Sequence, residues 1–451
     1  MNKMNRTIAL TVSVLLACSV AARAGEKLSL EASKALALEN NVEMKNSRLE
    51  TEAARKAKAM AFTKFFPTVS AMGLTLKADD PLLQISSQGG NLPVYDGNPL
   101  TLPFATQFAY FPASTTGLLG SLKMMSVTAV QPIFAGGRIA NGNRLAALGA
   151  SASEDKERLA RDKILRETEE QYWQIVTLAE KARTLESYEA LLRRLQAQVE
   201  DAYNAGLVMK NDVLKVKLQL SAVRLNKSRL ENGKALAVMA FCRHLGIDDD
   251  PSLELSDALT VTGAPDDYRI NHKAALEGRA EYKLLQASVR AETLKTRLTL
   301  GAYLPQLGVG VSGFYMKMDQ EKATTNGLVF GTLSIPLSGW WEGAYALGQQ
   351  KAREEIAKNS LKDNEALLLV QMDKAWKDLT DADRELALCR ESEAQADENL
   401  KVNQDGYDNG LITVSDLLEA QTLRQQARDR LTEAMAAYRI KVVAYLQATG
   451  R

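Results

Sequence analysis

Two acidic residues one helical turn apart, Asp416 and Glu419, have the type and spacing to act electrostatically. The segment from Thr413 to Asp416 has the pattern of a capping box, in which a carboxylate stabilises the start of a helix. Capping explains Asp416, but it does not explain Glu419, whose counterpart in an earlier, similar segment is Lys215. Carboxylates that line a pore attract cations. The pair therefore predicts a helix cap, a cation-attracting surface, or both.

No signature of a catalytic, cofactor-binding or metal-binding site is visible in the sequence. His244 and His272 stand alone without ligand spacing. No glycine-rich loop has the pattern of a phosphate-binding site, and no nucleophile has a nearby base. We therefore expect a protein that is not an enzyme and that has no cofactor.

The segment that carries the acidic pair is present twice. Residues 203–212 (YNAGLVMKND) return as residues 407–416 (YDNGLITVSD), 204 positions later. Asp212 is thus the earlier equivalent of Asp416. A carboxylate at this position also stabilises the helix by about 0.3 to 1 kcal/mol, because it lies near the positive end of the helix dipole. In each copy a glycine, Gly206 or Gly410, is expected to end a long helix in a left-handed cap.

Four prolines mark the predicted junctions between strands and helices, and their spacing shows where the two copies differ. Pro132 and Pro336 are 204 residues apart, whereas Pro67 and Pro305 are 238 apart. The first copy therefore carries an insertion, a long external loop at 79–123. The predicted organisation is a first repeat at 25–250, a linker at 251–271 and a second repeat at 272–451. Four apolar linker residues are expected to pack on the flank of the helices: Leu253, Leu255, Val261 and Tyr268.

Each repeat is expected to contain a helix, two strands and a long helical hairpin. Residues 133–250 and 337–451 lack proline and are rich in helix-forming residues. Alternating patterns predict strands at 68–77 and 126–134, and two more at about 307–314 and 328–335. Strands of about ten residues can cross a bilayer when tilted. The alternative is a small soluble sheet.

The N-terminus has the pattern of a secretory signal peptide, residues 1–24. Lys3 and Arg6 precede an apolar run, and the small residues before Gly25 form a cleavage site. The alternative is cleavage before a lipidated Cys18. Removal of the signal leaves a slightly acidic chain, which gives no support for a nucleic-acid partner. Cys242 and Cys389 are expected at heights too different for a disulfide, so both are predicted to be inert thiols.

Four strands are too few to close a barrel, and open strand edges are not tolerated in hydrocarbon. The chain must then assemble with copies of itself. Two copies would supply eight strands and three copies twelve, and the larger barrel leaves a water-filled lumen of useful width.

At this point the chain resembles the TolC-like outer-membrane factors, the exit ducts of efflux pumps and type I secretion systems. The resemblance implies a fold that is mainly α with a membrane β-barrel contribution: a homotrimer with a twelve-stranded barrel in outer-membrane lipid and a long helical periplasmic tunnel. It also implies a periplasmic adaptor protein and an inner-membrane transporter as partners. The alternative function is a non-conducting structural spacer anchored in the outer membrane. The matching segments are Leu28 to Glu31, Leu38 to Asn41, Val130 to Gly137, Gly206 to Val208, Gly410 to Ile412 and Tyr438 to Gly450.

The resemblance also implies roles for the two tips. Threefold symmetry would stack Asp416 and Glu419 as acidic rings at the periplasmic mouth, and Asp212 and Tyr407 would form part of a lock. Family members can have an arginine where this chain has Ile412. The residues expected to dock the adaptor are Gly206, Leu207, Val208, Gly410, Leu411 and Ile412.

Overall fold

The computed structural model describes residues 27–261, 263–319 and 321–451. The predicted signal peptide and its Cys18 lie outside these residues. The chain divides into two compact units. The first contains the described residues up to Ala54 together with Ala150–Ser288 and Lys358–Arg451, and the second contains Arg55–Gly149 and Val289–Ala357. Each unit thus combines segments from both predicted repeats.

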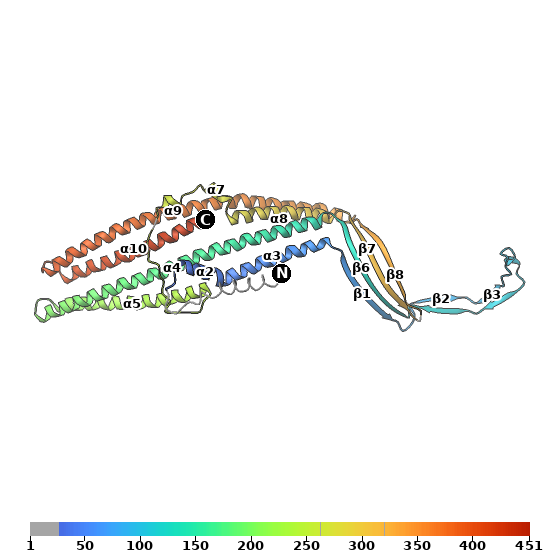
Figure 1. The fold of residues 1–451 in the computed structure, drawn as a ribbon, viewed down its shortest axis with the longest axis horizontal. Helices are drawn as coiled ribbons and strands as arrows, with labels where there is room; N and C mark the ends of the chain where they lie inside the picture. Colours follow the sequence, from blue (N-terminus) through green and yellow to red (C-terminus); the bar gives the residue numbers. More distant parts are fainter. Residues whose placement is uncertain (1–26, 262, 320) are drawn as a thin grey trace, which may run out of the picture. The chain divides into compact units, whose positions relative to one another are not determined.

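Long helices carry most of the chain, and they pair as two hairpins, α4 with α5 and α9 with α10 (Figure 1). The proline-free tracts form these helices, so the predicted mainly helical fold is confirmed. Among the described residues, no helix combines the length and the apolar character needed to span a bilayer. The helices are α2 (Leu30–Asn40), α3 (Val42–Phe62), α4 (Arg138–Asn204), α5 (Lys210–Leu245), α6 (Pro265–Tyr268), α7 (His272–Leu276), α8 (Ala280–Ala302), α9 (Gly339–Asp408) and α10 (Val414–Ala448).

Aromatic side chains fill the largest apolar core of the first unit. Tyr172 and Trp173 of α4 are fully buried and pack with Phe241 of α5. The guanidinium of Arg439 lies 4.2 Å from the centre of the Trp173 ring, a cation–π contact. The linker covers this core and a second one on α9 and α10, because Leu253 and Leu255 pack on the first and Val261 and Tyr268 on the second, as predicted. Both cysteines are free, and Cys242 is buried.

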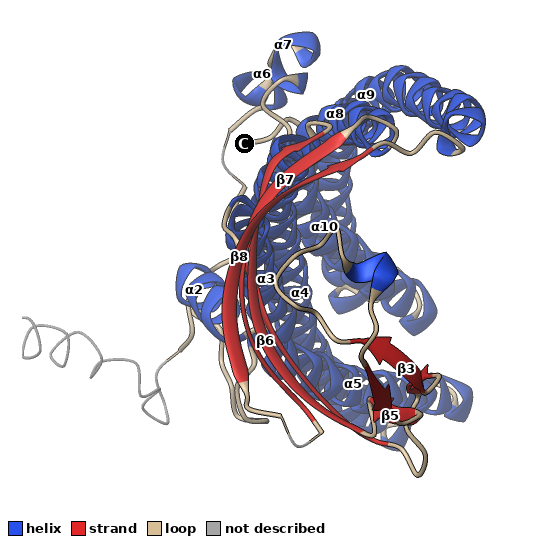
Figure 2. Cartoon of the chain, turned by 90° about the vertical axis from the view of Figure 1, so that its right-hand side faces the viewer, coloured by secondary structure: helices blue, strands red, loops and turns tan. Residues whose placement is uncertain are grey.

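The second unit contains a four-stranded antiparallel sheet with the order β1-β6-β7-β8. The strands curve together as one sheet (Figure 2). Their bounds are β1 (Thr68–Lys77), β6 (Ser121–Ala135), β7 (Gln306–Met318) and β8 (Thr324–Ser334). The prediction for β1 was correct to the residue. The strand predicted at 126–134 is longer, because its ladder to β1 continues to the pair Lys77–Ser121.

The two faces of the sheet differ in exposure and in chemistry. Along β7 every odd-numbered residue from Leu307 to Lys317 is exposed, and every even-numbered residue is buried or half-buried. Val309 and Val311 lie on the exposed face. The hydroxyls of Thr128 and Ser312 hydrogen-bond across the other face at 2.8 Å. This period of two gives an exposed face rich in valine and an opposite, less exposed face that carries hydroxyl groups among apolar side chains.

The insertion at 79–123 differs from the predicted loop. It forms two short antiparallel ribbons, β2 with β5 and β3 with β4, and its last three residues already belong to β6. Each of these strands has only four or five residues, so the sequence pattern was too short to identify them. The elements are β2 (Leu83–Ser87), β3 (Gly90–Pro93), the 3-10 turn η2 (Leu102–Phe104), β4 (Phe108–Phe111) and β5 (Ser114–Leu118).

Candidate functional site

The tips of the two long hairpins are built in the same way. α4 ends at Asn204 and Gly206 has a φ of +75°, while α9 ends at Asp408 and Gly410 has a φ of +72°. At each tip the glycine N–H and the next N–H return to helix carbonyls three and five residues back, as in a Schellman motif. The predicted left-handed caps are therefore present.

The six predicted docking residues divide into two kinds. Leu207 is 79% exposed and Leu411 is 80% exposed, so each tip presents one free leucine beside its glycine. Val208 and Ile412 instead pack against a buried cluster of valines and leucines between the hairpins. Apolar side chains that face inward stabilise the tips, and the two leucines remain available for contact. The members of the buried cluster are Leu195, Val199, Val213, Val216, Val414 and Leu417.

Asp416 caps α10 in the predicted capping box. Its Oδ2 accepts the Thr413 backbone N–H at 2.9 Å and the Thr413 hydroxyl at 2.7 Å, and its own N–H donates to Thr413 Oγ1 at 3.3 Å. Hydrogen bonds from the Thr413 side chain and backbone lower the pKa of Asp416, and the nearby charge of Lys215 adds to this effect. Asp416 therefore stays ionised in weak acid.

Glu419 lies one turn beyond Asp416 on the same exposed face of α10. Both acids are exposed, whereas Val414, Leu417 and Ala420 on the opposite side of the helix are buried. The exposure fits the predicted acidic surface, since neither carboxylate is buried in the core of the hairpins. Which surface lies opposite this face depends on assembly.

Asp212 occupies the equivalent position at the start of α5, but it does not form the equivalent cap. The residue before the helix is Met209, whose side chain makes no capping hydrogen bond. Asp212 contributes a first-turn negative charge, which the helix dipole favours. Its Oδ1 lies 3.6 Å from Lys215 Nζ, so the charge is also part of an ion pair.

Lys215 was not predicted as a site residue, yet it connects the two hairpins. Its ammonium donates to the Ser415 hydroxyl at 2.6 Å. This bond joins α5 to α10 across 200 positions of sequence. Only the alignment of Lys215 with Glu419 pointed to this position, because nothing in the sequence identifies Ser415 as its acceptor.

Tyr407 lies within electrostatic range of Asp212. Tyr407 packs on the cluster between the hairpins. Burial raises the pKa of Tyr407, and the charges of Asp408 and Asp212 raise it further. Among the described residues no hydrogen bond joins Tyr407 to Asp212, so their relationship in this structure is electrostatic.

The junction prolines are placed as predicted in three cases of four. Pro67 lies directly before β1, Pro305 directly before β7, and Pro336 between β8 and α9. Pro132 instead lies inside β6, at an irregularity of its ladder with β7. The passage from β6 to α4 occurs at two glycines that follow the strand, Gly136 and Gly137, both with positive φ.

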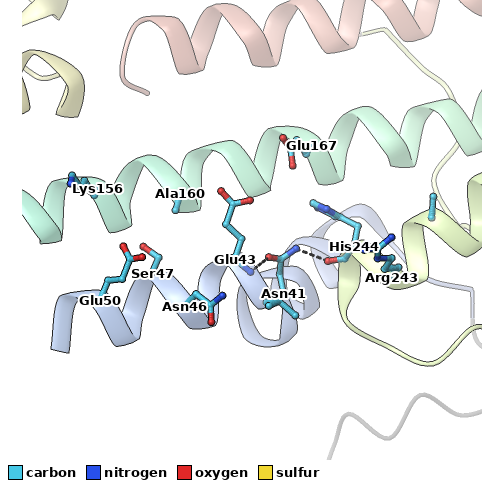
Figure 3. Close-up of a pocket in the computed structure, with 12 residues that line it drawn as sticks. Asn41, Glu43, Asn46, Ser47, Glu50, Lys156, Ala160, Glu167, Arg243 and His244 are labelled. Atoms are coloured by element: carbon cyan, nitrogen blue, oxygen red, sulfur yellow. Dashed lines mark hydrogen bonds between the residues drawn. The ribbon is translucent and has the colours of Figure 1, made fainter. Parts of the chain in front are cut away.

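A separate cavity of about 860 Å³ lies where α2 meets α3, beside α4 and α5 (Figure 3). Asn41 forms its centre: the side chain donates to the His244 carbonyl at 2.8 Å and accepts the Glu43 N–H at 2.8 Å. His244 Nε2 lies 2.9 Å from the Thr168 hydroxyl, which already donates to the Ile164 carbonyl. The hydroxyl must therefore accept from the ring, and the contact anchors His244.

The second histidine also has a structural role. His272 Nδ1 lies 2.8 Å from Asp373 Oδ1 and its Nε2 lies 3.1 Å from the Tyr445 hydroxyl. Tyr445 is fully buried, so this set ties the start of α7 to α9 and α10. Among the residues that the structure describes, no group of three or more His, Cys, Asp or Glu side chains is arranged to hold a metal ion.

Comparison with known proteins agrees with this architecture. A family model described as "Outer membrane efflux protein" matches residues 112–246 and 272–451. The structure of the Campylobacter jejuni CmeC outer membrane channel superposes with a TM-score of 0.76 at 16% identity, covering 93% of this chain and 85% of that one. The Vibrio cholerae outer membrane protein VceC gives a TM-score of 0.74 at 15% identity, covering 93% and 96%. A search of curated proteins found no match.

Proposed function

The chain belongs to the outer membrane efflux protein family, and from this premise we propose that it is the exit duct of a tripartite efflux pump or type I secretion system. In this proposal three copies form a passive channel in the outer membrane of a Gram-negative bacterium. The substrate is chosen by the inner-membrane transporter, and the helical part extends through the periplasm.

The observation that carries the proposal is the four-stranded sheet with one apolar exposed face and two free edges. β1 and β8 are the edge strands, and neither has an outer partner within the described chain. In hydrocarbon each unpaired backbone group costs several kcal/mol, so the edges must pair with other copies. Three copies give a twelve-stranded barrel, with the apolar face toward lipid and the hydroxyl-bearing face toward the lumen.

The hairpin tips are proposed to form the periplasmic gate. In a trimer the exposed pair Asp416 and Glu419 would repeat three times around the axis and favour cations at the mouth. The Lys215–Ser415 bond and the packing of Tyr407 on the cluster between the hairpins would hold the two hairpins of each chain together. Opening would then require these links to break or to move as a unit.

The free leucines Leu207 and Leu411 support a docking role for the tips. An exposed apolar side chain on a rigid helical turn is a suitable anchor for a partner. A periplasmic adaptor protein would contact both tips of each chain and connect the duct to the transporter.

The test is single-channel recording on the detergent-solubilised protein in planar bilayers, together with its mass in detergent. A trimer that gives discrete conductance steps is the expected result. A stable monomer that needs no detergent would contradict the barrel. A trimer that never conducts, even when Asp416 and Glu419 are both neutralised and the Lys215–Ser415 bond is removed, would favour the non-conducting spacer.

A further inference from the structure

Three lysines lie together on one face of the sheet. The register places Lys123 of β6 directly opposite Lys317 of β7, and it pairs Lys123 with Thr75 of β1. Lys77, two residues beyond Thr75, is the diagonal neighbour of Lys123. All three positions fall on the exposed, odd-numbered face. Like charges directly opposite one another destabilise a sheet, so this arrangement needs a compensating group.

The three lysines lack an ion-pair partner within the described part of the chain. All three lysines are exposed, and none forms an ion pair with a described residue. Asp319 follows β7 in the adjacent turn, where its backbone has a positive φ and its carboxylate accepts the backbone N–H of Ser121. The lysines therefore form a positive site that is open to an anion from outside the chain.

An apolar surface leads up to the lysines on the same face. Its exposed residues include Val69, Val127, Val309, Val311, Val329 and Leu333. Tyr315, which the register pairs with Met125, lies between this surface and the lysines. An apolar band, then an aromatic ring, then basic side chains is the order found at the interface of a lipid-facing barrel surface.

The length of the band fits one bilayer. Leu307 and Lys317 are the first and last exposed residues of this face on β7, ten residues apart. Ten residues extend about 33 Å along a strand. At a strand tilt of about 40° this gives a height of about 25 Å, the height of the apolar band on outer-membrane barrels. The lysines then lie at one interface and Leu307 at the other.

Chain connectivity decides which interface is which. α3 and α8 lead into β1 and β7, and β6 and β8 lead into α4 and α9, so all four helices join the sheet at the Leu307 end. Exposed aromatic residues, Trp340, Trp341 and Tyr345, follow β8 at that end. If the helices are periplasmic, the lysines lie in the outer leaflet.

We propose that Lys77, Lys123 and Lys317 bind the phosphate groups of a phosphorylated lipid in the outer leaflet. The proposal rests on the proposed function for the orientation of the sheet. Directly opposite residues in an antiparallel pair have Cα atoms about 4.5 to 5.5 Å apart, so two ammonium groups reach one phosphate. Their alkyl stems can lie along the apolar surface while the charged ends reach the headgroup.

The experiment is native mass spectrometry of the purified protein with a bis-phosphorylated glycolipid and with the same lipid lacking phosphate. Basic residues at an anionic surface contribute about 1 kcal/mol each, which is about five-fold in affinity. We expect about five-fold weaker binding for K123Q and about 100-fold for the triple variant K77Q/K123Q/K317Q. Lys322→Gln, in the turn between β7 and β8, is the matched control and should bind like the unaltered protein.

Three results would overturn the lysine site. These are equal lipid binding by the triple variant and the control, equal binding of the lipid without phosphate, and binding of inorganic phosphate alone as tightly as the lipid. Subunit number and conductance are measured on the same samples. If the triple variant is trimeric, conducts and still binds the lipid fully, only the lysine site is wrong. If the unaltered protein is monomeric, the proposed function is wrong.

Discussion

The ammonium of Lys215 donates to the hydroxyl of Ser415 at 2.6 Å, and this bond connects the second turn of α5 to the first turn of α10. These two helices begin the returning arms of the two hairpins. The bond therefore ties the beginning of one returning arm to the beginning of the other.

Replacing Lys215 with Met should loosen the hairpins while keeping most of the side-chain volume. Loss of a charged hydrogen bond at a part-exposed site costs about 1 kcal/mol. The resting conductance in planar bilayers should then rise about five-fold. Lys217→Met is the control, because the Lys217 ammonium pairs with Glu200 within one hairpin, at 2.8 Å. Equal conductance in both variants would show that the Lys215 bond does not restrain the gate.

Replacing Glu419 with Gln should lower cation preference without affecting a helix cap. The side chain is exposed and keeps its size, so folding should not change. Reversal potentials under a salt gradient measure the effect. Asp416→Asn should lower cation preference too, but it also weakens the bonds with Thr413. If the reversal potential of Glu419→Gln equals that of the unaltered channel, Glu419 does not face the conducting path.

The pH dependence of Asp416 is best measured in the Glu419→Gln background. The bonds from Thr413 lower its folded pKa below the ordinary value of 3.8. A depressed carboxyl pKa contributes stability above the unfolded pKa and loses it as the pH falls through the folded pKa. Cation preference and the helical signal should therefore persist at pH 5 and decline only below about 3.8. A midpoint above pH 5 would contradict the capped geometry.

Two glycines with similar backbone angles should respond differently to alanine. Gly206 has open space around its added Cβ position, so Gly206→Ala should cost only the left-handed strain of about 1 to 2 kcal/mol. At Gly246, with a φ of +67°, the Cβ would lie 2.6 Å from the Asn40 carbonyl oxygen. Gly246→Ala should lower the thermal midpoint clearly more than Gly206→Ala. Equal shifts would mean that α2 moves away without cost.

Ile412→Arg introduces, at this position, the arginine that the resembled family can have there. Ile412 packs on the same cluster as Tyr407, whose pKa responds to the charge of Asp212. A guanidinium at this position should bond to that carboxylate and lower the resting conductance. Ile412→Met keeps an apolar side chain and serves as the control. A higher conductance for Arg than for Met would show that packing matters more than the added charge.

The sequence predicted the repeated elements well because they depend on local periodicity and on turn residues. Gly206, Gly410 and the Thr413–Asp416 capping box are local signals, and each has the geometry that its pattern predicts. The break between α2 and α3 was missed. It depends on Asn41, which bonds to the His244 carbonyl 203 positions away.

Contacts between distant segments were the part that local patterns could not supply. Asp212 lies in the first turn of α5, as its predicted effect on the helix start requires, but Met209 has no side-chain oxygen for a capping box, and the carboxylate pairs with Lys215. Lys215 itself has a partner that only the folded hairpins bring near. The ribbons of the insertion were missed because their strands are too short to show a clear alternation of apolar and polar residues.

The alternation along β7 limits how this chain can change its length during evolution. Losing one residue between Leu307 and Lys317 would move every later side chain to the opposite face and turn the lysine end inward. Losing two residues would keep each side chain on its own face and would shorten the exposed band by one side chain. Viable length variants of this strand should therefore differ by even numbers, and an odd change should occur only together with a bulge that restores the parity.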